Sequence, residues 1–179
     1  MKKNIFTLLL FIATSLLATS TFWPKINNAD VSFAQNMSEH HNQAIEMSFV
    51  LLAGSENDEL KGLAYDIINT QATQRGMMMG WLQSWNEPMS SNINHAQMES
   101  MGMASDNEIK RLYSLSGNEL DSLFIELMTN HHLGGIKMAE TYVQNGKYTL
   151  QMSLAETMIA GQQGEIDYLK SLNFADEAI

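Results

Sequence analysis

Cysteine is absent from this chain of 179 residues. Its absence rules out disulfide bonds, metal sites built on thiolates, c-type haem attachment and catalysis by a cysteine nucleophile. Any metal chemistry must therefore rely on other donor atoms.

Basic residues are also scarce. Ten lysines and arginines stand against 20 aspartates and glutamates, which gives a formal net charge of −10 at pH 7. An acidic chain without a basic patch is a poor candidate for binding nucleic acid or anionic lipid. We therefore expect no nucleic acid among its partners, and no membrane association once a signal peptide is removed.

The common catalytic motifs are missing as well. No glutamate lies three residues before a histidine, as the Glu-x-x-His motif of di-iron helical bundles requires. The sequence has no Gly-x-Ser-x-Gly elbow, no glycine-rich phosphate loop and no His-Glu-x-x-His zinc motif. We predict that the protein is not an enzyme.

The first 20 residues have the pattern of a signal peptide. Lys2 and Lys3 precede an almost unbroken apolar run over residues 5–18, and Ala18 and Ser20 supply the small residues of a cleavage site. The run is short for a transmembrane helix, which needs about twenty residues. We predict cleavage after Ser20, with an uncleaved anchor as the alternative, and a periplasmic or secreted domain. Cleavage leaves 8 basic and 20 acidic residues, a net charge of −12.

A phrase rich in methionine and histidine occurs twice in the chain, the second time 91 residues after the first. The first copy consists of Phe33, Met37, His40, His41, Ala44, Ile45 and Met47. The second copy consists of Phe124, Met128, His131, His132, Gly135, Ile136 and Met138. The register continues without a gap to Leu172 and pairs Gln71 with Gln162. The chain is therefore an internal repeat with two similar halves.

Each half contains two segments with apolar residues at helical spacing, and strand signals are nearly absent. We predict an all-α fold, a four-helix bundle of the ferritin-like type made of two pseudo-symmetric αα-hairpins. The expected boundaries are Gly54 after the first helix, Ser55 with Asp58 before the second, Pro88 after it, Ser105 with Glu108 before a short helix, Ser116 with Glu119 before the third long helix, and Gly146 before a fourth over 147–172.

The predicted organisation follows from these boundaries. A signal peptide (1–20) and an N-terminal linker (21–29) precede a helical metal-binding domain (30–179). Within this domain the repeat halves, 30–88 and 119–173, flank a polar, methionine-rich linker, 89–118.

The repeated histidines are the strongest candidates for metal ligands. On a helix, Met37 and His41 lie on one face because they are four residues apart, and His40 flanks them. A thioether and an imidazole placed in this way suit one metal ion, and Met128 and His132 repeat the arrangement. The spacing is compatible with two equivalent sites or with one shared site. Duplication would also copy an inert pair, so repetition alone is limited evidence.

Methionine is abundant, with 14 residues, and each can be either a core residue or a metal ligand. Methionines commonly fill gaps in helical cores. The run 77–79 covers most of a helix circumference, however, so not all of its members can be core. A second cluster falls in the polar linker and contains His95, Met98, Met101 and Met103. We favour metal ligation for this cluster, and the alternative is that the linker folds over the bundle and buries it.

The donor types indicate the metal. Thioethers select Cu(I) and its heavier analogue Ag(I), whereas imidazole also accepts Cu(II). We predict a copper-binding protein with these candidate ligands: Met37, His40, His41, Met77, Met78, His95, Met98, Met101, Met103, Met128, His131 and His132.

The doubled order Met-x-x-His-His-x-x-Ala-Ile-x-Met, followed by a glutamine-rich helix, resembles the bacterial family known as domain of unknown function 305, and within it the copper-binding CopM type. The resemblance extends from about residue 29 to residue 172. It implies an exported helical bundle that binds copper and silver, contributes to copper resistance, and has its metal-associated positions at Met37, His40, His41, Met128, His131 and His132. The chain departs from the family pattern at Gln74, Arg75 and Gly135.

The leading hypothesis is therefore a periplasmic copper buffer or chaperone that exchanges metal ions, with other copper-handling proteins as further partners. A copper-dependent oxidase is one alternative, and it would need a redox-active site with an open coordination position. A methionine-rich helical module that binds a partner protein is the other.

Overall fold

The computed structural model describes residues 25–175, and the predicted signal peptide lies outside this range. Regular structure within the described range is entirely α-helical. The helices are α2 (Asn28–Gly54), α3 (Asp58–Trp85), α4 (His95–Ser100), α5 (Asp106–Ser114), α6 (Gly117–Asn145) and α7 (Thr149–Ala175).

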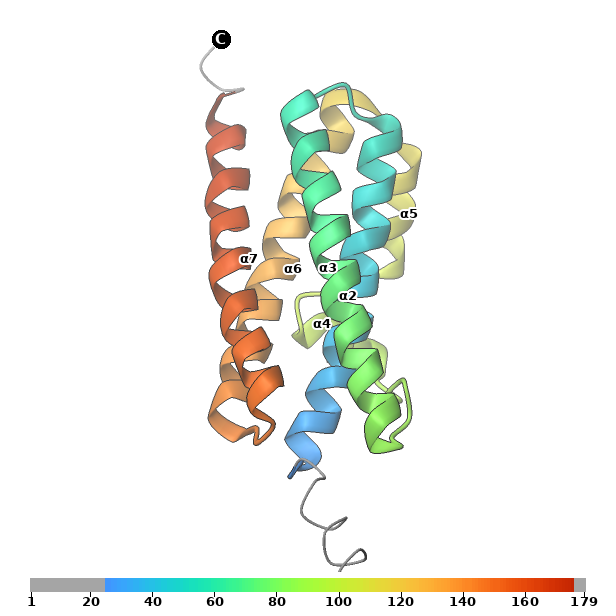
Figure 1. The fold of residues 1–179 in the computed structure, drawn as a ribbon. Coiled ribbons are helices and arrows are strands. Elements are labelled where there is room, and N and C mark those ends of the chain that lie inside the picture. The colour runs from blue at the N-terminus through green and yellow to red at the C-terminus, as the bar shows by residue number, and fades with distance from the viewer. Residues whose placement is uncertain (1–24, 176–179) are drawn as a thin grey trace, which may run out of the picture.

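Four long helices form the bundle. Helices α2 and α3 pack as one hairpin and α6 and α7 as the other, while α2 and α6 join the hairpins through the centre (Figure 1). The outer helices α3 and α7 touch only sparsely. The predicted all-α bundle of two hairpins is confirmed.

Most of the expected boundaries are found where the sequence placed them. Helix α2 ends at Gly54, and Ser105 caps α5 through a reciprocal bond with Glu108. The predicted cap of α3 was wrong in detail. Asn57, rather than Ser55, accepts hydrogen bonds from the first backbone N–H groups of that helix. Ser116 precedes α6 but makes no capping hydrogen bond among the described residues.

A buried carboxylate joins the start of α2 to the loop between α6 and α7. Asp30 accepts hydrogen bonds from the Tyr142 hydroxyl at 2.7 Å and from the backbone N–H groups of Lys147 and Tyr148 at 2.9 and 3.0 Å. Burial alone raises the pKa of Asp30, but these hydrogen bonds outweigh it and leave the pKa below its usual value. This contact fixes one end of the bundle.

The hydrophobic core is divided into two clusters. One contains Met47, Leu51, Phe124 and Met128 and lies toward the loop between α2 and α3. The other contains Phe33, Met37, Met78 and Leu82 and lies toward the opposite end. The residues between the clusters on all four helices are polar, and they include His40, His41, Gln71, His131, His132 and Gln162.

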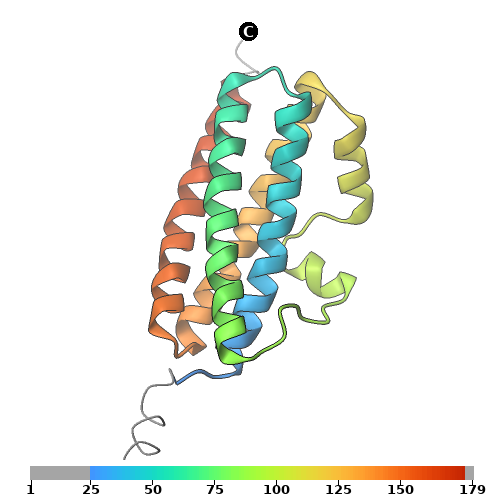
Figure 2. The same cartoon turned by 45° about the vertical axis from the view of Figure 1, so that its right-hand side comes forward.

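The linker between the hairpins is more ordered than its composition indicated. It forms the short helices α4, which the sequence did not predict, and α5. Figure 2 shows both along the side of the bundle remote from α7. None of the helices in residues 25–175 combines the length and hydropathy that crossing a membrane requires.

Candidate metal site

The four repeated histidines meet in one buried layer. His40 on α2 stacks on His131 on α6, with ring centroids 3.6 Å apart. The His41 ring lies 6.4 Å from that of His40, and the His132 ring lies 6.2 Å from that of His131. All four side chains are fully buried. The two histidine pairs therefore occupy a common layer on the pseudo-two-fold axis rather than two separate places.

Hydrogen bonds fix the orientation of three of these rings. His41 Nε2 lies 2.8 Å from Gln74 Oε1, and His132 Nε2 lies 2.5 Å from Glu165 Oε2. His40 Nε2 lies 3.1 Å from the Met101 carbonyl oxygen. Since each partner atom is an acceptor, Nε2 carries the proton and donates, which leaves Nδ1 with a free lone pair in the neutral ring.

The remaining ring nitrogens are unsatisfied. Nδ1 of His40, His41 and His132 and both nitrogens of His131 lack a hydrogen-bond partner among the described residues. Buried polar atoms are normally hydrogen-bonded, and exceptions mark sites of function or of a bound ion or water. Since a neutral imidazole has one N–H and one lone pair, each of the four rings can offer one nitrogen as a ligand.

Burial keeps the rings of His40, His41 and His131 neutral. Loss of solvent lowers the pKa of His40 to about 3 and, despite the bond to Gln74, that of His41 to about 4. The pKa of His131 is also well below its usual value, chiefly because of burial and then because of His40 beside it. A neutral imidazole binds a metal ion without first losing a proton, so the layer is ready to bind at neutral pH.

Two buried glutamines complete the layer. Gln71 and Gln162 are equivalent in the repeat, and they are 2% and 4% exposed. Neither amide has a hydrogen-bond partner within residues 25–175. A Cβ atom at Gly135 would lie 2.4 Å from Gln162 Oε1 and 3.0 Å from His40 Cε1. Glycine at this position, where the first half has Ala44, therefore makes room for the polar layer.

The candidate methionines are distributed differently. Met37 and Met128 are fully buried one helical turn from His41 and His132, in opposite core clusters. Met78 packs in the same cluster as Met37, whereas Met77 is 43% exposed. Met77 is thus largely exposed and Met78 is buried in the core, and the role of both as ligands stays a prediction.

The linker cluster reaches the buried histidines through its backbone. His95 is exposed on α4, and Met98, Met101 and Met103 are partly buried. The recorded contact with the layer is the carbonyl of Met101, which accepts from His40. The linker thus folds onto the bundle, as the alternative interpretation expected, and its thioethers stay predicted ligands.

Two contacts hold the linker in place. The Gln43 side chain pairs with the backbone of Ala104, donating to its carbonyl at 2.8 Å and accepting from its N–H at 2.7 Å. At the equivalent position of the second half, Gly134 lets the backbone of Met101 and Gly102 approach α6. A Cβ atom at Gly134 would lie 1.8 Å from the Met101 carbonyl oxygen.

Replacing Gly134 with alanine is therefore expected to displace the linker. Overpacking against backbone costs about 1–3 kcal/mol, and the His40 bond to Met101 would also be lost. Urea unfolding and limited proteolysis of the linker test this expectation. Gly80→Ala is the matched control, since its Cβ would meet no other atom of residues 25–175 within 4 Å and alanine favours the helix. Equal stability of both variants would contradict the expectation.

Carboxylates do not complete a conventional cation site. No group of three or more histidine, aspartate or glutamate side chains within residues 25–175 is placed to hold one ion. The stacked rings of His40 and His131 instead suit an ion held by two donor atoms, or an ion that binds after one ring has rotated. The donor set consists of neutral nitrogen atoms with neutral thioethers one turn away, and this chemistry fits a soft ion such as Cu(I).

The sequence did not identify several members of this layer as functional. Gln71 and Gln162 were visible only as matching positions in the repeat. Gln74 and Glu165 also occupy equivalent positions of the repeat. The glutamine at position 74 was visible as a departure from the family pattern. Their contacts with His41 and His132 depend on the packing within each hairpin, for which spacing gives no direct signal.

A comparison with protein-family models identifies the family of this chain. The model for the domain of unknown function DUF305 matches residues 30–173. The chain belongs to the DUF305 family. A search of curated proteins finds no match.

Solved structures of this family share the fold. A DUF305 protein from Streptomyces coelicolor is 42% identical, with a TM-score of 0.75 over 80% of this chain and 89% of that chain. A DUF305 fragment from Deinococcus radiodurans is 29% identical, with a TM-score of 0.78 over 83% and 97%. CopM in its Cu(II)-bound form is 30% identical, with a TM-score of 0.68 over 80% and 94%, and CopM has also been solved with Cu(I) and with silver.

Proposed function

We propose that this DUF305 protein is an exported copper-binding protein that takes up Cu(I) and Cu(II), and Ag(I) as a surrogate, without catalysing a reaction. It acts as a buffer or chaperone in copper resistance. The observation that carries the proposal is the buried layer of four histidines, in which five ring nitrogens have no partner among residues 25–175.

The cost of this layer supports a functional origin. Leaving a buried polar group unpaired costs about 1–3 kcal/mol, and apolar residues would join the two core clusters without that cost. The free energy of binding an ion would offset this cost, which accounts for a polar layer that destabilises the metal-free fold. The structures of CopM with Cu(I), Cu(II) and silver support copper as that ion.

The donors divide by oxidation state. The imidazole nitrogens of His131 and its neighbours suit Cu(II) and also accept Cu(I). Met37 and Met128 place a thioether on the same helix face as His41 and His132, and thioether donors favour Cu(I) and Ag(I). The mixture explains how one layer serves both oxidation states outside the cytoplasm, where cysteine thiolates oxidise readily.

Export is supported by two observations. The first 20 residues have the charge and hydropathy pattern of a signal peptide, and the relative from Streptomyces coelicolor is described as a proposed secreted protein. A periplasmic or secreted location is consistent with the lack of cysteine.

The methionine pattern does not favour a partner-binding surface. An adaptable methionine-rich surface needs several exposed side chains. Among residues 25–175 only Met77 and Met89 are exposed, at 43% and 41%, whereas Met37, Met47, Met78, Met128 and Met158 are at most 2% exposed.

The proposal is tested by titrating the purified protein with Cu(I) and with Ag(I) under anaerobic conditions, against a chromophoric chelator that competes for the ion. We expect at least one tightly held ion per chain and a rise in melting temperature on loading, because binding to the folded state stabilises it. Binding no stronger than that of an acidic surface would refute the proposal.

A further inference from the structure

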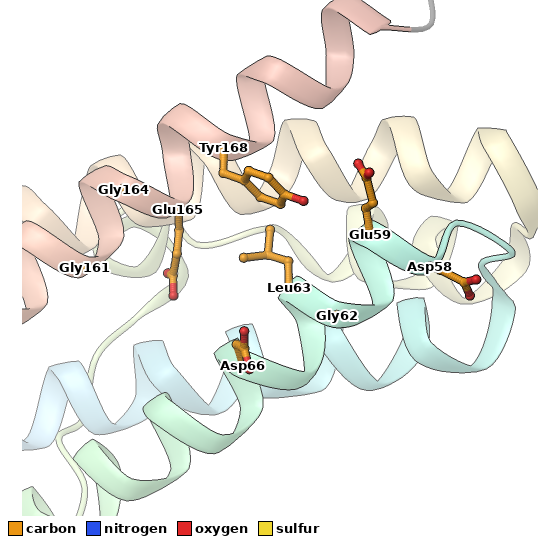
Figure 3. A pocket seen from close by; sticks show the side chains of 9 residues that line it. All are labelled: Asp58, Glu59, Gly62, Leu63, Asp66, Gly161, Gly164, Glu165 and Tyr168. Atoms are coloured by element: carbon orange, nitrogen blue, oxygen red, sulfur yellow. The ribbon is translucent and has the colours of Figure 1, made fainter.

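The outer helices α3 and α7 leave a crevice between them. Its outer part has a volume of about 530 Å³. Figure 3 shows Leu63 and Asp66 of α3 and Glu165 and Tyr168 of α7 projecting into this space. Gly161 and Gly164 line it from α7, and a Cβ atom at either would meet no other atom of the described residues within 4 Å.

The crevice continues along α3 and α7 toward the histidine layer. A smaller chamber of about 220 Å³ shares Gly161 and Glu165 with the outer part. Gln74 and Glu165, which line the chamber, are the hydrogen-bond partners of His41 and His132. At about 30 Å³ per water molecule, the chamber has room for roughly seven waters, which is enough for an ion with a hydration shell.

Two buried side chains of this chamber are unsatisfied. Gln71 and Gln162 line it, and their amide oxygens and nitrogens have no hydrogen-bond partner in the part of the chain that the structure describes. A buried amide without a partner indicates a bound ligand or water. Amide oxygens can replace part of the water shell of an entering cation.

The charge of the crevice favours a cation. Asp58, Glu59 and Asp66 lie in its outer part and Glu165 at its inner end. Lys61 compensates only the outermost carboxylate, since it pairs with Asp58 at 3.2 Å and the Asp58 side chain is 95% exposed. Aligned carboxylates concentrate cations and accelerate their capture.

The opposite face of the layer is covered. The linker lies against α2 and α6, with the Met101 carbonyl on His40 and the Gln43 side chain holding Ala104. Entry from that side requires the linker to detach, whereas the crevice already leads to Glu165.

The two inner walls are not equivalent. Glu165 and Ile166 of α7 match Gln74 and Arg75 of α3 in the repeat. His132 Nε2 lies against the carboxylate of Glu165, whereas His41 Nε2 lies against the uncharged amide of Gln74. A cation is therefore attracted more strongly toward His132, which has a carboxylate beside it, than toward His41.

From these contacts we propose that the crevice between α3 and α7 is the entry path for copper ions, and that the ion passes Glu165 and the buried glutamines to reach His132 first. This route rests on the proposed copper-binding function.

The test is to plug the crevice without touching the layer. Gly161→Leu places a side chain in the open space at the junction of the two chambers, and Gly80→Leu is the matched control on a helix surface outside the crevice. Stopped-flow mixing of metal-free protein with Cu(II), followed by absorbance, measures the loading rate. We expect Gly161→Leu to load about tenfold more slowly, with unchanged stoichiometry, and Gly80→Leu to load as the unmodified protein does.

A charge variant tests the route without adding volume. Glu59→Gln with Asp66→Asn is expected to reduce the loading rate about tenfold at low salt and to weaken its salt dependence. Glu119→Gln with Glu126→Gln, which lie outside the crevice on α6, is the control. Unchanged rates in both crevice variants, with the unmodified protein binding copper, would overturn the route alone. Failure of the unmodified protein to bind copper would overturn the proposed function and the route with it.

Discussion

Replacing His40, His41, His131 and His132 together with leucine is expected to reduce the affinity for Cu(II) by at least about 100-fold. The variant removes every ring nitrogen of the buried layer. It also joins the two hydrophobic clusters into one core, so we expect the helix content to be retained. Competition titration with Cu(II) and circular dichroism measure these quantities.

The fifth histidine provides the control for this experiment. His95 is exposed on α4, away from the layer, so His95→Gln is expected to leave the Cu(II) affinity within about threefold of the original, since exposed side chains contribute little. Unchanged Cu(II) affinity in the variant with four leucines would exclude the histidine layer as the binding site. Replacing Met98, Met101 and Met103 separates the linker thioethers from the layer, since only Cu(I) and Ag(I) capacity should respond.

The metal-free protein is expected to lose about 4 kcal/mol of stability between pH 7 and pH 5. In the unfolded chain histidine titrates near pH 6.5, whereas burial lowers the pKa of His40 to about 3 and that of His41 to about 4. The unfolded state therefore binds more protons as the pH falls below 6.5, and stability decreases by about 1.4 kcal/mol per histidine and pH unit. At pH 5 this is about 2 kcal/mol for each of the two, a large share of a typical total of 5–15 kcal/mol.

Urea unfolding at several pH values, with a chelator present, measures this loss. The stability contributed by the neutral rings is fully present above pH 6.5 and disappears as the pH falls toward 4 and 3. The variant with four leucines should show a much flatter profile over the same range, because it has no buried imidazole to protonate. Equal stability of the unmodified protein at pH 7 and pH 5 would contradict the prediction.

Much of the fold could be predicted from local patterns. The apolar spacing, the capping pair of Ser105 and Glu108 and the end of α2 at Gly54 depend on residues within a few positions of one another. The repeat of 91 residues also implied two equivalent hairpins. The linker was less predictable, because α4 and the docking of Met101 depend on contacts with Gly134 and Gln43, which are distant in sequence.

The candidate site was predicted only in part. The histidines were identified from their doubled spacing, but Gln74 and Glu165 were not, since each lies 33 residues from the histidine it contacts. The methionines that look alike in sequence separate into buried core residues such as Met78 and exposed ones such as Met77, because helix rotation decides which side chain faces inward.

The sequence by itself determined the helices, the two-fold repeat and the exclusion of thiolate chemistry, because these depend on residue type and on short, regular spacing. Tertiary structure alone decided that His40 stacks on His131 in one shared layer, that the linker covers one face of it, and that a crevice between α3 and α7 reaches the other. These features arise from the angle and depth at which two hairpins pack, and this geometry is set by many side chains together rather than by any local motif.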